Sequence, residues 1–342
     1  MATGSDMPLL LLAMLAKVGV VLLVLLTTIA YAVWLERKVV ARIQSRWGPY
    51  LVGPHGLLQP VADALKIFFK EDIVPTEVDR VVYCLAPFLA FSLALLSISV
   101  IPFGESVTIG GATIHFQITD LNVGLLFVFA VTSLGVYGVA LAGWSSNSKY
   151  SLLGGLRSSA QMISYELSLG LGVVGVVMLA GSLSLREIVE RQSGLWNVFV
   201  QPVGFLIYFT AAVAETNRIP FDLPEGESEL VGGFHTEYSS FKFAMFFMAE
   251  YANIVTVSCL ATLLFFGGWL GPVFGPSLLR ALLPVFWFSL KVFCFLFLYI
   301  WIRGTLPRFR YDQLMAFGWK FLLPLGLLNV LVTSLVLAWR ST

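Results

Sequence analysis

The sequence is poor in charge. Only 12% of its 342 residues are Asp, Glu, Lys or Arg, whereas 58% are hydrophobic. A typical soluble domain carries about 25% charged residues. The net charge of +1 offers no basic surface that would indicate a nucleic-acid partner. The composition therefore excludes an ordinary soluble domain and favours a protein whose solvent is lipid.

The sequence also lacks clustered metal ligands. Three cysteines and three histidines are spread along it: Cys84, Cys259, Cys294, His55, His115 and His235. Zinc, iron–sulfur and haem sites need several thiolates or imidazoles in suitable spacing. The cysteines each lie in an apolar run and are interpreted as small buried apolar residues. We expect this chain to bind no metal and to carry no redox centre of its own.

Long apolar runs dominate what is present. Runs of about 18 or more apolar residues predict membrane-spanning helices. Eight spans are predicted, at 8–35, 81–102, 122–143, 161–181, 198–215, 241–267, 281–302 and 321–339. The first run has no basic segment before it and is interpreted as a span, not as a removable signal. No internal repeat of the transporter type accompanies the runs. We expect an all-α polytopic membrane protein with one membrane domain, 1–342.

Basic residues predict the orientation of the spans. The connections 36–80, 144–160, 216–242 and 303–320 hold 15 of the 21 Lys and Arg residues. Connections rich in Lys and Arg face the cytoplasm or its equivalent. With eight spans, both termini are then predicted on the opposite, periplasmic side.

The first basic connection contains an amphipathic segment, 57–71. Polar Gln59, Asp63, Lys66 and Lys70 recur at helical spacing, and apolar side chains fill the other face. The segment is too short and too charged to span a bilayer, so a helix along the membrane surface is predicted. Two interpretations stay open: an interfacial brace, or the floor of an opening for a lipid-soluble substrate.

The third basic connection is rich in acids. Six lie in or beside it: Glu215, Asp222, Glu225, Glu227, Glu229 and Glu237. Only Arg218 and Lys242 oppose them. One interpretation is a solvated acidic loop. The other is that these acids line a hydrated cavity or meet basic groups of another subunit.

Ionisable residues also fall inside predicted spans. Glu166 lies in the fourth span, Glu215 closes the fifth and Glu250 lies in the sixth. Charges in the bilayer are costly and usually mark ion or proton pathways, although a structural ion pair remains an alternative. Lys17 and Lys291 also lie in spans and are open to either interpretation.

Four long blocks carry a family resemblance. They are ERKVVARIQSRWGPYLVGPHGLLQPVADALKIFFKED, GWSSNSKYSLLGGLRSSAQMISYEL, RIPFDLPEGESELVGGFHTEYSSFKFAMFFMAEYANI and RGTLPRFRYDQLMAFGWK. In order and spacing over 36–320 they resemble the quinone-site membrane subunit of proton-pumping NADH:quinone oxidoreductase, respiratory complex I. This subunit family carries the letter H in bacteria and the number 1 in mitochondria.

The resemblance implies an architecture and partners. Eight tilted spans and a surface helix would form the membrane-facing part of a quinone chamber. Quinone would be the substrate, reduced at peripheral-arm subunits that carry the terminal iron–sulfur cluster and the quinone head site. Flavin and iron–sulfur clusters would reside in partner subunits. Further partners would be small adjacent membrane subunits and the lipid of a bacterial plasma membrane or mitochondrial inner membrane.

The resemblance also implies roles for individual residues, none of them catalytic in this chain. The quinone chamber would be lined by Arg37, Gln44, Arg46, Trp47, Lys66, Phe69 and Asp72. A proton or charge relay would use Glu166, Glu215, Glu225, Glu227, Glu229, Glu237 and Glu250, opposed by Arg218, Arg303 and Arg308. Some family members carry an acid in the third span, but this sequence has none there.

The expected function is coupling of quinone reduction to proton translocation through the relay acids. Two alternatives stay open. One is the equivalent subunit of a membrane-bound hydrogenase or another non-NADH oxidoreductase. The other is a free-standing ion transporter, which the missing repeat and the acid-rich connection disfavour.

Overall fold

The computed structural model describes residues 7–109, 112–222 and 232–341, which form helices joined by loops and one short hairpin. The longer helices are α1 (Met7–Ile43), α3 (Arg80–Ser97), α4 (Gly124–Ser145), α5 (Lys149–Ala180), α10 (Ser240–Phe265), α11 (Ser277–Thr305) and α13 (Leu323–Ser341). The shorter helices are α2 (Gln59–Phe68), α6 (Leu185–Glu190), α7 (Asn197–Val200), α8 (Pro202–Glu215) and α12 (Tyr311–Phe317). Single 3₁₀ turns cover Pro54–Gly56, Ile98–Val100 and Gly233–His235, and a π-helical turn, Gly318–Leu322, joins α12 to α13. Strands β1 (Val107–Ile109) and β2 (Ala112–Ile114) pair antiparallel.

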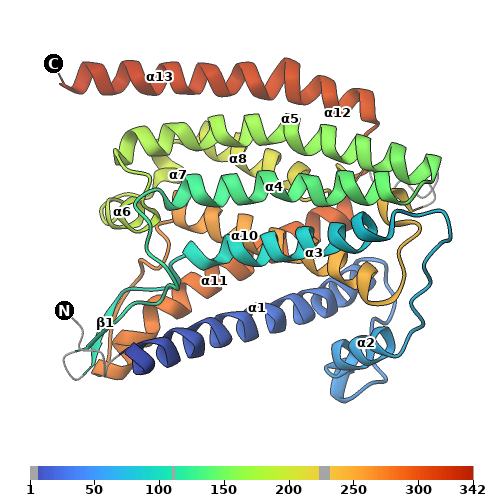
Figure 1. The fold of residues 1–342 in the computed structure, drawn as a ribbon. Coiled ribbons are helices and arrows are strands. Elements are labelled where there is room, and N and C mark those ends of the chain that lie inside the picture. The colour runs from blue at the N-terminus through green and yellow to red at the C-terminus, as the bar shows by residue number, and fades with distance from the viewer. Residues whose placement is uncertain (1–6, 110–111, 223–231, 342) are drawn as a thin grey trace.

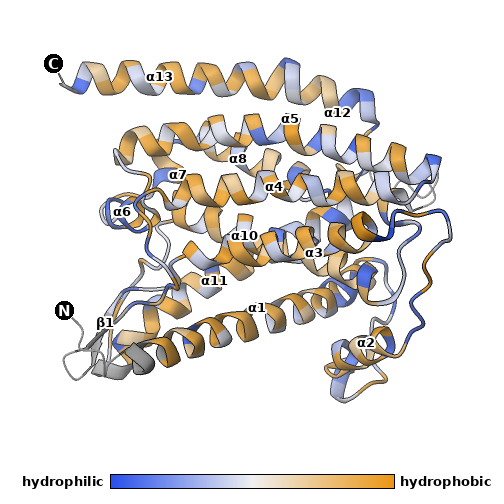
Figure 2. Ribbon diagram, in the orientation of Figure 1, coloured by the Kyte–Doolittle hydropathy of each residue, from blue (hydrophilic) through white to orange (hydrophobic). Residues whose placement is uncertain are grey.

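The long helices run side by side in one bundle (Figure 1). The start of α1, the hairpin and the end of α13 lie at one end of the bundle, and α2 lies at the other. The helices are mostly hydrophobic along their lengths, whereas hydrophilic residues gather at the end that carries α2 (Figure 2). We call the end with α2 the inner end and the other the outer end.

Seven helical segments in the described part of the chain are long and apolar enough to cross a membrane. They are Met14–Ile43, Arg80–Val100, Gly124–Ser145, Lys149–Ala180, Ser240–Phe265, Leu279–Thr305 and Tyr311–Arg340. The predicted all-helical polytopic class is confirmed. The predicted count of eight is not reached, because α8, at the position of the fifth predicted span, has only 14 residues. A helix needs about 20 residues to cross the hydrocarbon core.

The fourth span begins earlier than predicted, at Lys149 and not at 161. Residues 149–160 contain enough Ser, Lys and Arg to suggest a loop. In the structure, Ser151 and Ser158 are fully buried, and Arg157 lies 5.2 Å from the ring centre of Tyr311. These polar residues continue the helix because they face protein and not lipid.

Small residues allow close packing between α3 and α4 and between α5 and α8. A Cβ on Gly138 of α4 would lie 2.8 Å from the Cβ of Ala90 in α3. A Cβ on Gly172 of α5 would lie 2.9 Å from the backbone nitrogen of Tyr208 in α8. Such contacts between small residues let backbones approach closely, which is how helices associate in lipid.

Lys291 of α11 closes the outer end of α10. Its ammonium donates to the backbone carbonyls of Phe266, Gly268 and Leu270 at 2.8, 2.9 and 2.8 Å. It also lies 4.7 Å from the ring centre of Trp196. The geometry supports the structural interpretation of this lysine, because its three hydrogen bonds hold the turn that follows α10.

Two amides complete this end of α10. Gln192 donates to the carbonyl of Leu263 at 2.8 Å and accepts from the backbone N–H of Gly267 at 3.0 Å. Asn197 donates to the carbonyl of Leu264 at 2.8 Å. We call Gln192, Asn197 and Lys291 the α10 cap.

The expectation of buried cysteines is correct only for Cys259. Cys84 and Cys294 are exposed on the helix bundle. In a membrane protein the outer surface is itself apolar. An apolar neighbourhood in the sequence therefore does not distinguish the core from the lipid face.

Candidate functional site

Five side chains from distant parts of the chain meet in one arginine–glutamate cluster: Glu36, Arg218, Glu250, Tyr251 and Arg303. Nη1 of Arg218 donates to the two carboxylate oxygens of Glu36 at 3.3 and 3.2 Å. Nε of Arg218 lies 2.5 Å from Oε1 of Glu250. Arg303 forms a second ion pair with Glu36, and the Tyr251 hydroxyl donates to Glu36 at 2.8 Å. The charges alternate in the order Arg303, Glu36, Arg218, Glu250.

The centre of this cluster is buried. Glu36 is 9% exposed and Arg218 is 6% exposed, and the Arg218 guanidinium lies 4.3 Å from the ring centre of Tyr251. Buried charges are tolerated when each has an opposite charge and hydrogen bonds. A cavity of about 20 Å³ beside the cluster has room for about one water molecule.

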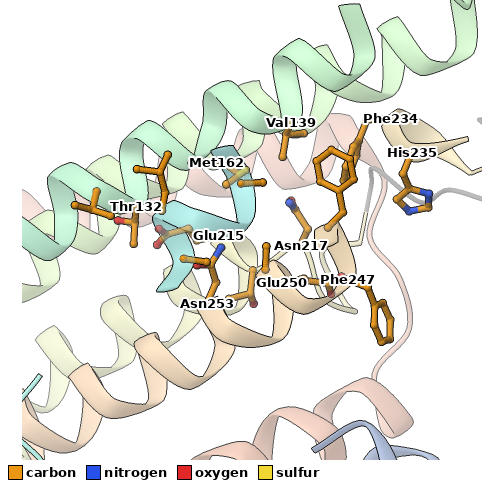
Figure 3. A pocket seen from close by; sticks show the side chains of 18 of the residues that line it. Thr132, Val139, Met162, Glu215, Asn217, Phe234, His235, Phe247, Glu250 and Asn253 are labelled. Carbon is orange, nitrogen blue, oxygen red and sulfur yellow. The ribbon is translucent and has the colours of Figure 1, made fainter. Parts of the chain in front are cut away.

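A larger cavity, the acid cavity, lies between α3, α4, α5, α10 and the end of α8. Its lining includes Glu215, Glu250, Asn217 and Asn253 among aromatic and aliphatic side chains. Figure 3 shows Glu215 and Asn253 at one end of the cavity and His235 at the other. Its volume of about 70 Å³ accommodates several water molecules, since one needs roughly 10–15 Å³ on this measure. The two carboxylates therefore have a space in which water can connect them.

Glu166 joins this group from α5. Ser133 of α4 donates a hydrogen bond to the Glu166 carboxylate. Glu166 also lies close enough to Glu215 for the two charges to interact. The third predicted span, which has no acid, thus contributes a hydroxyl at this point. Because Glu250 belongs both to the acid cavity and to the arginine–glutamate cluster, the two sites are continuous.

The first connection is tied to the end of α1 by one ion pair. Arg37 lies 2.6 Å from the carboxylate of Asp63 in α2, and Gln59 donates to the same carboxylate at 3.0 Å. Arg37 follows Glu36 directly in the chain. This segment therefore connects α2 to the arginine–glutamate cluster through two neighbouring residues.

The apolar face of α2 is uncovered. Val61 and Leu65 are each 54% exposed, and Phe68 and Phe69 are 75% and 81% exposed. Trp47, in the preceding turn, is 84% exposed. Apolar patches of this kind mark contacts with another protein, a ligand or lipid. The helix lies at the predicted position, and the nature of what covers it stays a prediction.

The chain after α2 is fastened to the start of α10. Lys242 pairs with Asp72 at 2.7 Å and lies 5.2 Å from the ring centre of Tyr83. Tyr83 stacks on Tyr238, whose hydroxyl is 3.2 Å from that of Ser145. Burial raises the pKa of Tyr238 to about 12, so the phenol is neutral at physiological pH. These contacts tie the segment after α2 to α3, α4 and the start of α10.

Other predicted site residues are placed differently. Gln44, Arg46, Lys66 and Arg308 are exposed, and Glu237 is half-buried. Arg308 lies outside the arginine–glutamate cluster, whereas Arg218 and Arg303 belong to it. The predictions for Glu225, Glu227 and Glu229 fall outside the described residues. The structure thus brings Glu166, Glu215, Glu250 and Arg218 together, and the roles of the remaining residues stay predictions.

The sequence analysis missed Glu36 as a site residue. Leu25, Ile29, Ala32 and Glu36 are all buried and recur at intervals of three and four residues along α1. That spacing places them on one face of a helix. The sequence does not show this stripe, because the residues between these positions are mostly apolar as well.

Comparisons with known proteins give a consistent match. The family model described as NADH dehydrogenase matches residues 16–334. The chain is 64% identical to an H-type subunit of NADH-quinone oxidoreductase from Koribacter versatilis, covering 98% of this chain and 100% of that protein. It is 53% identical to an H-type subunit of NADH-quinone oxidoreductase from Solibacter usitatus, covering 96% and 97%. It is also 53% identical to an H-type subunit from Geobacter sulfurreducens, covering 96% of each chain.

Proposed function

This chain belongs to the NADH dehydrogenase family, and from that premise we propose that it lines the quinone chamber of an NADH-quinone oxidoreductase and couples quinone reduction to proton translocation. As a multi-pass membrane subunit of that enzyme, it works with the other subunits of the complex. The proposal concerns what its own residues contribute.

The proposed chamber lies at the inner end, between the end of α1, α2 and the start of α10. The exposed apolar face of α2 supports it, because a quinone tail and lipid are both apolar. Arg37, Gln44, Arg46, Trp47, Lys66, Phe69 and Asp72 are the proposed wall residues. The chamber would be completed by peripheral-arm subunits that hold the terminal iron–sulfur cluster and the quinone head site. This chain would bind no flavin, metal or cluster itself.

The proposed coupling uses the continuity of the two charged sites. Arg218 bridges Glu36, next to the proposed wall residue Arg37, and Glu250, in the acid cavity. This single observation carries the proposal. Reduction of a quinone to a quinol consumes two protons. A change of charge near Arg37 and Glu36 would alter the balance around Arg218 and so the protonation of Glu250. Cavity water would then connect Glu250 to Glu215, whose charge interacts with that of Glu166.

The proposed route leaves the chain sideways at Glu166. This carboxylate is half-buried between α4 and α5, next to exposed Leu134, Ile163 and Leu167. A carboxylate facing lipid costs several kcal/mol, on the order of 3 on insertion scales. We therefore expect a small membrane subunit of the complex to cover this place.

The proposed topology has eight crossings. The short α8, extended by α7 across a bend at Gln201, would be the crossing that length alone does not identify. The inner end, with its excess of Lys and Arg, would face the cytoplasm of a bacterial plasma membrane or the equivalent side of a mitochondrial inner membrane. Both termini would lie on the periplasmic side, and α2 would lie along the membrane surface.

Glutamine substitutions test the relay. Glu250→Gln and Glu166→Gln keep the shape of the side chain but remove its exchangeable proton. We expect proton pumping by inside-out membrane vesicles oxidising NADH to fall about a hundredfold, the lower end of the range for lost acid–base groups. The complex should still assemble on a native gel. Glu187→Gln, at an exposed position of α6 at the outer end, is the matched control. Normal pumping by both relay variants would refute the proposal.

A further inference from the structure

His235 occupies a position that neither the fold nor the relay explains. It ends the 3₁₀ turn Gly233–His235 and lines the acid cavity together with Glu215 and Glu250. It is half-buried. Figure 3 shows it at the end of the cavity opposite Glu215 and Thr132. A half-buried side chain at the end of a cavity contacts both the interior and the exterior.

The imidazole is held in place by its surroundings. Its ring centre lies 5.0 Å from that of Phe234 and 5.2 Å from that of Phe243, both edge to face. The backbone of the turn packs closely on α5, since a Cβ on Gly154 would lie 2.7 Å from the backbone of Gly233 and Phe234. The ring is therefore positioned by packing and does not sample the wide space of a surface side chain.

We infer that His235 is the proton-transfer residue at the inner mouth of the acid cavity, where it passes protons from outside water to the cavity carboxylates. This inference rests on the proposed function. The ionisable side chains that line the same cavity are Glu215 and Glu250.

The step is balanced without any other reactant. One ring nitrogen of the neutral imidazole takes a proton from water outside the cavity, which gives an imidazolium. The other nitrogen releases its proton to water in the cavity, and that water protonates Glu250 or Glu215. Exchange of the tautomer or a ring flip restores the starting state. Imidazole suits this role because it exchanges protons at both nitrogens near neutral pH.

The competing explanation is that the His235 ring only fills space between its neighbours. His235→Phe distinguishes this packing role from proton transfer. Phenylalanine keeps an aromatic ring between Phe234 and Phe243 but carries no exchangeable proton. His235→Ala instead leaves space for a small base. His115→Ala is the control, because His115 lies at the outer end, 3.4 Å from Arg186.

The experiment uses inside-out vesicles that contain the whole enzyme, with NADH and a soluble quinone, in the absence and presence of added imidazole. We expect His235→Phe and His235→Ala to slow pumping and quinone reduction at least about fivefold, less than the loss of a full acid–base residue because cavity water gives a slower bypass. Added imidazole should restore His235→Ala several-fold and leave His235→Phe unchanged. His115→Ala should resemble the unmodified enzyme.

Two results would overturn the inference: full activity in His235→Phe, or a slow His235→Ala enzyme that imidazole does not accelerate. Glu250→Gln in the same vesicles distinguishes the two levels of argument. If Glu250→Gln still abolishes pumping, only the role of His235 fails. If Glu250→Gln pumps normally, the relay itself fails.

Discussion

Ionisable groups lie inside the bundle at both ends of α10, but their surroundings differ. At the inner end, Glu250 faces a cavity and shares Arg218 with Glu36. At the outer end, Lys291 donates to three backbone carbonyls in the α10 cap. Between them, every residue from Ile254 to Phe265 is buried. At the inner end, carboxylates face a cavity that has space for water. At the outer end, the ammonium of Lys291 donates all of its hydrogen bonds to backbone carbonyls.

This difference bears on the direction of the proposed proton movement. A proton pathway needs exchangeable groups linked by water or hydrogen bonds. Those groups lie at the inner end of α10, and its outer half is closely packed with aliphatic and small side chains. The contrast argues against a path straight along α10. It favours a lateral path from Glu250 and Glu215 to Glu166, whose carboxylate reaches the edge between α4 and α5.

The largest effect is expected from a substitution in the arginine–glutamate cluster at the inner end of α10. Arg218→Met removes the cation shared by Glu36 and Glu250. Glu36 keeps its ion pair with Arg303, whereas Glu250, which faces the acid cavity, loses its ion pair with Arg218. Removing one member of a buried ion pair costs about 3–5 kcal/mol. We expect little assembled enzyme on native gels and no measurable quinone reduction in membranes.

The double variant Arg218→Met with Glu250→Gln identifies the cause. It removes the carboxylate that lost its ion pair with Arg218 and keeps the pair between Glu36 and Arg303, so assembly should recover while pumping remains absent. If the double variant assembles no better than Arg218→Met, the arginine acts by its shape and not by its charge.

A smaller and different effect is expected at the α10 cap. Lys291→Met leaves three carbonyls without their donor, and an unsatisfied buried polar group costs about 1–3 kcal/mol. The midpoint of thermal inactivation of the purified enzyme should fall by several degrees. The number of protons pumped per electron should stay unchanged in the enzyme that remains folded.

Lys291→Gln serves as the graded control, since its amide still donates two hydrogen bonds. Its thermal midpoint should lie between those of Lys291→Met and the unmodified enzyme. A lower proton-to-electron ratio in Lys291→Met without a loss of thermal stability would mean that both ends of α10 take part in transport, and the comparison would fail.

The sequence predicted the architecture well where hydropathy was decisive. Uninterrupted apolar runs place the seven long segments, and the amphipathic pattern at 57–71 coincides with α2, Gln59–Phe68. The prediction from hydropathy was wrong where a helix is surrounded by other parts of the protein and not by lipid. The polar start of α5 suggested a loop, and α8 is shorter than a span needs to be because Pro202 opens a new helix after the bend at Gln201.

The candidate site was predictable as a set of residue types but not as a set of pairs. Glu166, Glu215 and Glu250 stand out because acids are rare in spans. Their partners come from positions far apart in the chain, such as Glu36 with Arg218, and composition contains no information on that pairing. Arg303 and Arg308 look equivalent in the sequence, yet only Arg303 belongs to the cluster, because α11 ends there and the chain turns outward.

The smallest effect is expected from an ion pair whose geometry looks as good as that of the cluster. Arg186 lies 2.9 Å from Glu190 on α6, at the outer end, with side chains that are 31% and 55% exposed. Water screens such a pair, and an exposed pair four residues apart on a helix contributes about 0.3–0.5 kcal/mol. Glu190→Gln should therefore change the thermal midpoint by less than about 1 °C and leave pumping unchanged, a shift several times smaller than that of Lys291→Met. A measurable loss of pumping in Glu190→Gln would show that outer-surface charge takes part in coupling. Equal bond lengths would then be no guide to function at either end, and burial would no longer explain why Arg218 matters more than Arg186.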